Sequence, residues 1–134
     1  MPRLVVLMAP LLLVAACAAA PSGPPAVEKG ELTDAADGTH IAIKRGGELK
    51  VVLDANPTVL LPWEADANVG PVLSPIGQRI YVGKTMNSFD IAGGGWNIFR
   101  YRAEQAGRVT LHFATRRPGD SAAAKTVGYE VLVE

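Results

Sequence analysis

Three short segments in the second half of the chain have the residue types of a surface that binds another protein. They are Asn56-Pro57-Thr58 followed by Trp63, Gly93-Gly94-Gly95 followed by Phe99, and Arg117-Pro118. Prolines stiffen a loop, glycines let its backbone approach another backbone, and arginine pairs with carboxylates or carbonyls. This is the chemistry of reversible recognition, because no segment pairs a nucleophile with a base.

The first segment is stiffened at both ends. Pro57 fixes its own φ and restricts Asn56 to extended backbone, and Pro62 stiffens the far end. Between the prolines lie three apolar residues, Val59, Leu60 and Leu61. Two interpretations stay open: they bind a partner, or they fold back onto the core.

The other two segments allow similar alternatives. The glycine run 93–95 precedes an expected strand, so it is not a phosphate-binding loop, which needs a following helix. It lets the backbone approach a partner, or it is simply a flexible loop. Arg116 and Arg117 either pair with a partner or form a solvated charged turn.

The elements between these segments have the period-2 pattern of strands. Alternating apolar residues predict strands at 41–43, 49–53, 99–103, 109–113 and 127–133, and shorter strands start at Trp63 and cover 79–82. Gly46-Gly47 is predicted to be a turn, and 69–77 fits an edge strand or a loop. About seven short strands predict an all-β, immunoglobulin-like β-sandwich. In that topology, loops 56–62, 84–96 and 116–125 emerge at one end and form one surface.

The start of the chain predicts export. Residues 1–16 combine Arg3 with an apolar run, as a signal peptide does, and the run is too short for a spanning helix. Small residues before Cys17 resemble a bacterial lipobox, which predicts lipidation of Cys17; the alternative is an ordinary signal peptide. We expect a tether over 17–26, a domain over 27–134, and an anchor in the outer membrane facing the periplasm. Cys17 is the only cysteine, so the domain has no disulfide.

Charge and residue types argue against several other functions. The chain has 13 basic and 13 acidic residues, and removing Arg3 leaves 12 against 13, so nucleic acid is not an expected partner. His40 and His112 fall on outward positions of their strands, and no cluster has metal-ligand spacing. We therefore expect a monomer that is not an enzyme and uses no cofactor or metal.

The three segments resemble the chagasin family, proteinaceous inhibitors of papain-like cysteine proteases. That family has an Asn-Pro-Thr-Thr-Gly-aromatic-x-Trp loop, a Gly-x-Gly-Gly-x-x-x-Phe loop and an Arg-Pro-Trp loop. The matches here, in the same order and at fitting intervals, are Asn56, Pro57, Thr58, Trp63, Gly94, Gly95, Phe99, Arg117 and Pro118. The departures are Val59, Leu60, Leu61, Ala92 and Gly119, the last in place of the tryptophan.

The resemblance implies a sandwich whose three loops form a wedge that plugs a protease cleft. The first loop would enter beside the catalytic Cys and His, with Thr58 and Val59 nearest them. Protease-binding residues would be Asn56, Pro57, Thr58, Val59, Leu60, Gly93, Gly94, Gly95, Arg117 and Pro118, while Trp63 and Phe99 would be structural. The departures also motivate a rival hypothesis, a non-inhibitory binding or assembly module of the cell envelope.

Overall fold

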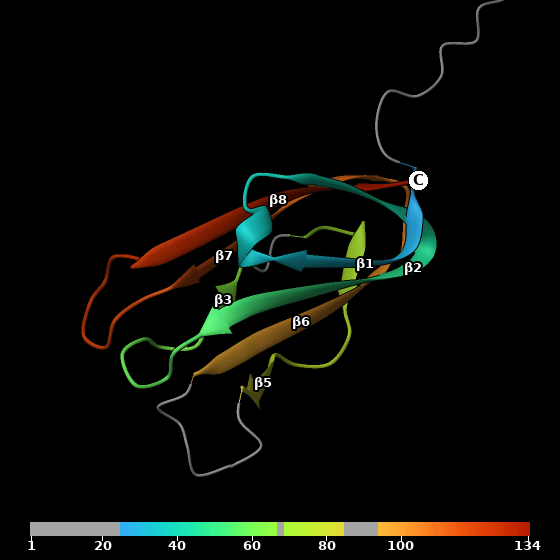
Figure 1. Ribbon diagram of the computed structural model, residues 1–134. Helices are drawn as coiled ribbons and strands as arrows, with labels where there is room; N and C mark the ends of the chain where they lie inside the picture. The colour runs from blue at the N-terminus through green and yellow to red at the C-terminus, as the bar shows by residue number, and fades with distance from the viewer. Residues whose placement is uncertain (1–24, 67–68, 85–93) are drawn as a thin grey trace, which may run out of the picture.

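Residues 25–66, 69–84 and 94–134, which a computed structural model describes, form an essentially all-β structure of strands joined by turns and loops. The elements in chain order are β1 (Val27–Thr33), a 3₁₀ turn η1 (Asp34–Ala36), β2 (His40–Ala55), β3 (Glu64–Ala65), β4 (Leu73–Pro75), β5 (Ile80–Gly83), β6 (Gly95–Ala103), β7 (Gly107–Thr115) and β8 (Lys125–Val133). The strands form one curled sheet of order β3-β7-β8-β2-β6-β4, with β1 on β2 and β5 on β6 (Figure 1). The predicted all-β fold is confirmed.

The curled sheet folds over into two layers. β2 runs through both of them and bends where they meet. Its start pairs in parallel with β8, and after the bend it pairs antiparallel with β6. The prediction that Gly46-Gly47 is a turn between two strands is therefore wrong. Gly46 has a φ of +85°, and a Cβ on Gly47 would lie 2.5 Å from the carbonyl oxygen of Glu28. The two glycines bend the strand without ending it.

β1 is a strand that the sequence pattern does not predict. It runs parallel to β2, from Val27 opposite Ile43 to Thr33 opposite Val52. Of its residues only Leu32 is buried. Because only one side chain of this edge strand is buried, its sequence does not alternate between apolar and polar residues. Because its partner is parallel, no tight hairpin turn connects the two strands and marks the pairing in the sequence.

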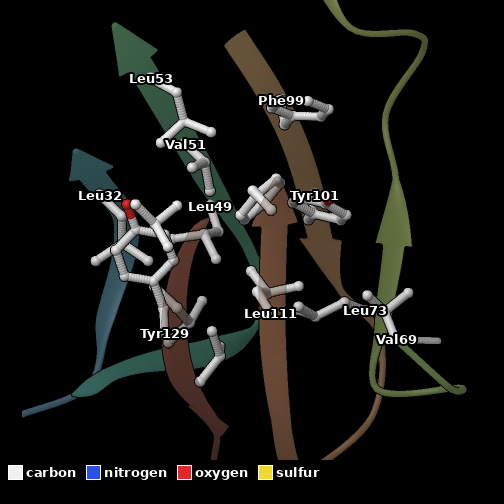
Figure 2. Packing of buried hydrophobic residues seen from close by; sticks show 14 of the residues in the cluster. Leu32, Leu49, Val51, Leu53, Val69, Leu73, Phe99, Tyr101, Leu111 and Tyr129 are labelled. Atoms are coloured by element: carbon white, nitrogen blue, oxygen red, sulfur yellow. The ribbon is translucent and has the colours of Figure 1, made fainter. Parts of the chain in front are cut away.

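The core lies between the layers and follows the alternation of the sequence. The fully buried larger side chains include Leu49, Val51, Leu53, Leu111, Phe113, Tyr129 and Val131. Figure 2 shows side chains of several strands turned toward this common interior. The rings of Phe99 and Phe113 lie 4.8 Å apart between centroids, which joins β6 to β7 across the core.

Two short strands continue the sheet on β6. The segment 69–77 contains one of them: β4 pairs Leu73 with Ala103, so the edge-strand alternative for this segment is the one observed. The strand predicted at 79–82 is β5, which pairs Ile80 with Ile98. All four residues of β5 are exposed, since no further strand or layer among the described residues covers it.

The C-terminus lies at the end of the sandwich where β1 begins (Figure 1). There the amide of Arg45 donates a hydrogen bond to the carbonyl oxygen of Glu134 over 2.9 Å. The predicted signal peptide (1–16), Cys17 and the tether up to residue 24 lie outside the described residues. Within the described ranges, no helix has the length and hydropathy needed to cross a membrane.

Candidate functional site

The predicted loops meet at one end of the sandwich, which we call the loop edge. It comprises the first loop (56–62), the described ends of the second loop (84 and 94–96) and the third loop (116–124). The first and third loops lie at the same end in Figure 1. The amide of Leu61 donates to the carbonyl oxygen of Arg116 over 2.8 Å, and the hydroxyl of Thr115 donates to the carbonyl oxygen of Leu61 over 2.6 Å. These bonds join two loops that are far apart in sequence.

The second loop joins the same edge through β2 and β6. Ala55, which ends β2, pairs with Gly95, which begins β6. The amide of Lys84 donates to the carbonyl oxygen of Gly94 over 3.1 Å and closes the base of the loop. Residues 85–93, including the predicted binding residue Gly93, lie outside the described residues.

The first loop is ordered by its own hydrogen bonds. The side-chain oxygen of Asn56 accepts from the amide of Thr58 over 3.3 Å and from its hydroxyl over 2.5 Å. The carbonyl oxygen of Asn56 accepts from the amide of Leu60 over 2.9 Å. An asparagine side chain that bonds to the backbone two residues on forms an Asx turn. The loop is therefore pre-shaped before any partner binds.

The apolar tip of the first loop points mostly to solvent. Val59 is 53% exposed and Leu61 is 42% exposed, and Pro57 and Thr58 are exposed as well. Only Leu60 is half-buried. The alternative in which all three apolar residues fold back onto the core does not describe this loop.

The base of the first loop is fixed by Trp63. Its ring is 2% exposed, and its Nε1 donates to the carbonyl oxygen of Asp54 over 2.8 Å. Its amide donates to Oδ1 of Asn97 over 2.9 Å, and Nη1 of Arg79 donates to its carbonyl oxygen over 2.7 Å. Asn97 is 3% exposed and was not predicted. The available signal was a polar residue at an inward position of β6, two residues before Phe99.

The two described glycines of the second loop serve the fold directly. Gly94 and Gly95 are both buried. Gly94 has a φ of +71°, a backbone conformation that residues other than glycine rarely adopt. A Cβ on Gly95 would lie 2.3 Å from the carbonyl oxygen of Val82 and 2.6 Å from the ring of Tyr81. The bare backbone of Gly95 is thus covered by an aromatic ring of this same chain.

The third loop carries two arginines, of which Arg116 is ion-paired and Arg117 is exposed. Arg116 forms an ion pair with Glu64 at 3.1 Å, which ties this loop to β3. Arg117 and Pro118 are exposed, and no ion pair is formed by Arg117 with any described residue. The amide of Asp120 donates to the carbonyl oxygen of Arg117 over 3.1 Å, and Gly119 has a φ of +86°. Proline followed by a glycine at positive φ matches a type II turn.

Residues suited to metal or acid–base chemistry do not gather at this edge. His40 lies on another face, where its Nδ1 is 2.9 Å from a carboxylate oxygen of Glu130. Lys84, at the edge, is paired with Asp54 and lies 5.5 Å from the ring centroid of Trp96. Across residues 25–66, 69–84 and 94–134 there is no group of three His, Cys, Asp or Glu side chains that could hold a metal ion. The loop edge therefore offers a binding partner an ordered shape, exposed apolar side chains and positive charge.

The family profile described as "Chagasin family peptidase inhibitor I42" matches residues 42–131. The chain belongs to the chagasin family. The matched stretch runs from the start of β2 almost to the end of β8 and contains all three loops of the loop edge.

Solved structures give the same fold for this chagasin-family chain. One is the cysteine protease inhibitor EhICP2 from Entamoeba histolytica, with 18% identity and a TM-score of 0.62 over 84% of this chain and 100% of that one. Another is amebosin, with 26% identity and a TM-score of 0.65 over the same shares of the two chains. A comparison with curated proteins found no match.

One departure of this chain from the chagasin pattern has a structural explanation. Gly119 stands where the family motif has tryptophan, and its positive φ suits glycine far better than a residue with a Cβ. The turn at Arg117-Pro118 therefore depends on the residue that replaces the aromatic one. Val59 is exposed and Leu60 is half-buried, and the structure gives no reason for their change from the family residues.

Proposed function

We propose that this chagasin-family protein is a reversible inhibitor of papain-like cysteine proteases and that it occludes the active-site cleft with the loop edge. The observation that carries the proposal is the joining of the three family motifs at one end. The Leu61–Arg116 hydrogen bond joins the first loop to the third, and the Ala55–Gly95 pair brings the second loop beside the first. Membership of a family of peptidase inhibitors, and the likeness to the cysteine protease inhibitor EhICP2, support this class of target.

In this proposal the first loop enters the cleft. Its exposed tip, Pro57 to Val59, would lie nearest the catalytic Cys and His of the target. The Asx turn at Asn56 already holds the tip in shape, so binding costs little loop entropy. The exposed guanidinium of Arg117, on the third loop, would flank it. In this proposal the complex forms and separates without a covalent step.

The second part of the proposal concerns location. The sequence around Cys17 supports export and lipidation at that residue, with the domain facing the periplasm from the outer membrane. The anchor would add membrane binding without changing the loop edge. Metabolic labelling with a palmitate analogue tests it: wild type should be labelled and Cys17→Ser should not.

Titration of active papain and other papain-like enzymes with the purified protein tests inhibition. Enzyme activity should fall with added protein and recover on dilution. Thr58→Arg should abolish the effect, because a long charged side chain at the exposed tip cannot enter a narrow cleft. Absence of inhibition by wild type at micromolar concentration across several such enzymes would remove the proposal and favour a non-protease partner.

A further inference from the structure

A hollow of about 220 Å³ opens beside the first loop, on the side facing β5. One wall is formed by the first loop and the other by the chain leading into β5. Its main lining residues are Pro57, Leu60, Leu61, Arg79, Tyr81 and Asn97. None of the three sequence motifs includes Arg79 or Tyr81. The hollow is therefore a feature of the loop edge that the motifs do not describe.

Tyr81 gives this hollow an aromatic wall. It pairs with the buried Asn97 across β5 and β6, so its side chain lies on the inward side of β5, next to the first loop. The ring lies against Gly95, in the space that a Cβ would occupy, which limits its movement. Tyr81 is nevertheless 46% exposed. A restrained, half-exposed aromatic ring is a common anchor in protein interfaces.

Arg79 gives the hollow a positive charge. One of its nitrogens, Nη1, donates to the carbonyl oxygen of Trp63, which holds the guanidinium beside the first loop. Among the described residues, no carboxylate forms an ion pair with Arg79. A guanidinium has five N–H donors, so donors remain for a carboxylate from outside. Lys84, which follows β5 and does not line the hollow, is already paired with Asp54.

We infer that this hollow is an additional subsite of the loop edge, and that it receives an acidic side chain from the rim of the target's cleft. The carboxylate would pair with Arg79, and the aliphatic stem would lie against Tyr81 and Leu60. Tyr81 then supplies an aromatic contact at an edge whose third loop has Gly119 instead of the family tryptophan. This inference rests on the proposed function. It adds the requirement that the target carries an acidic side chain on the rim of its cleft.

The test measures inhibition constants against each papain-like enzyme that wild type inhibits, at low and high salt. Arg79→Gln should weaken inhibition roughly tenfold at low salt, because it removes a charged hydrogen bond. It should also flatten the salt dependence, since screening acts on charge pairs. Arg79→Lys keeps the charge and should retain the salt dependence. Tyr81→Ala should weaken inhibition roughly tenfold at both salt concentrations.

Ile80→Thr is the matched control, because Ile80 lies on the opposite face of β5 and is similarly exposed. It should change the inhibition constant less than about threefold. Thermal unfolding of every variant checks the fold. A loop displaced by loss of the Arg79–Trp63 bond would weaken binding equally at both salt concentrations, which is a different outcome from a flattened dependence.

The outcomes separate the two proposals. If wild type inhibits and the salt dependence survives Arg79→Gln, the acidic subsite is wrong while inhibition stands. If only Tyr81→Ala weakens binding, an apolar side chain occupies the hollow and the acidic occupant is wrong. If wild type inhibits no papain-like enzyme, the proposed function and the subsite both fall.

Discussion

The side-chain oxygen of Asn97 accepts a hydrogen bond from the backbone amide of Trp63 over 2.9 Å. Asn97 lies on β6, directly after the second loop, and Trp63 directly follows the first loop. The bond therefore fixes the spacing between two of the three loops that we propose to act together. Because Asn97 is 3% exposed, its loss would leave the amide of Trp63 buried without this partner.

Replacing Asn97 by leucine should destabilise the protein and weaken inhibition together. An unsatisfied buried amide costs about 1–3 kcal/mol of the free energy of unfolding. Urea unfolding measures that loss, and papain titration measures the effect on binding. Arg102→Ala, on an exposed position of the same strand, should change neither by more than about 0.5 kcal/mol. Equal stability of Asn97→Leu and wild type would contradict the role assigned to this bond.

Asn56→Ala should weaken inhibition much more than it weakens the fold. The substitution removes the oxygen that accepts from both the amide and the hydroxyl of Thr58, so the loop must be ordered on binding. We expect a roughly tenfold higher inhibition constant, with a change in unfolding free energy below about 1 kcal/mol. Asn56→Asp keeps an acceptor oxygen and should lose less. An unchanged inhibition constant for Asn56→Ala would show that the Asx turn does not pre-shape the loop.

Gly95→Ala should be costly, although its backbone φ is ordinary. A Cβ there would lie 2.3 Å from the carbonyl oxygen of Val82, so β5 must move away from β6. Overpacking of this kind costs about 1–3 kcal/mol. Gly128→Ala is the control, because the nearest atom to its Cβ would be a side-chain atom of His112 at 3.3 Å. Urea unfolding of both variants compares them, and equal stabilities would refute the close approach.

Stability should fall when the pH rises from 10 toward 12. Burial raises the pKa of Tyr101 to about 12, and burial together with the carboxylates of Asp34 and Asp37 raises the pKa of Tyr129 to about 12. The unfolded chain releases these protons near pH 10, whereas the folded chain keeps them. The unfolded state is then favoured, and the stabilisation present below pH 10 is lost through this window. Urea unfolding at several alkaline pH values measures the slope.

Tyr129→Phe separates this effect from general alkaline unfolding. The variant lacks the hydroxyl that donates to the carbonyl oxygen of Thr33 over 2.6 Å, so it should be less stable at neutral pH. Its stability should nevertheless depend less steeply on pH above 10, because one titrating group is gone. A slope identical to that of wild type would mean that Tyr129 does not titrate in this window.

The sequence predicted the parts of the fold that depend on local alternation. Leu49, Val51 and Leu53 alternate with more polar neighbours, and they are buried as expected. The bend at Gly46 was read as a turn, because glycine pairs mark both features and only the packing of β1 distinguishes them. β1 itself was missed, since a parallel edge strand with one buried residue leaves no period-2 pattern.

The candidate site was predictable only where a motif marks it. Asn56, Thr58 and Arg117 belong to motifs, and the structure brings their loops to one end. Asn97 and Tyr81 belong to none. Their roles come from pairing across β5 and β6, which depends on the register of two strands separated by a long loop. Sequence spacing does not specify such a register when an exposed strand has no buried face.

The course of β1 has a consequence for how the protein would work at a membrane. β1 begins opposite Ile43, beside the bend of β2, and runs in the direction that leads to the first loop. A lipid on Cys17 would therefore hold the domain at the end where β1 begins, which is opposite the loop edge. Ten residues, 17–26, reach at most roughly 35 Å when fully extended. Such a tether would leave the loop edge on the side of the domain away from the bilayer, where enzymes of the periplasm could reach it.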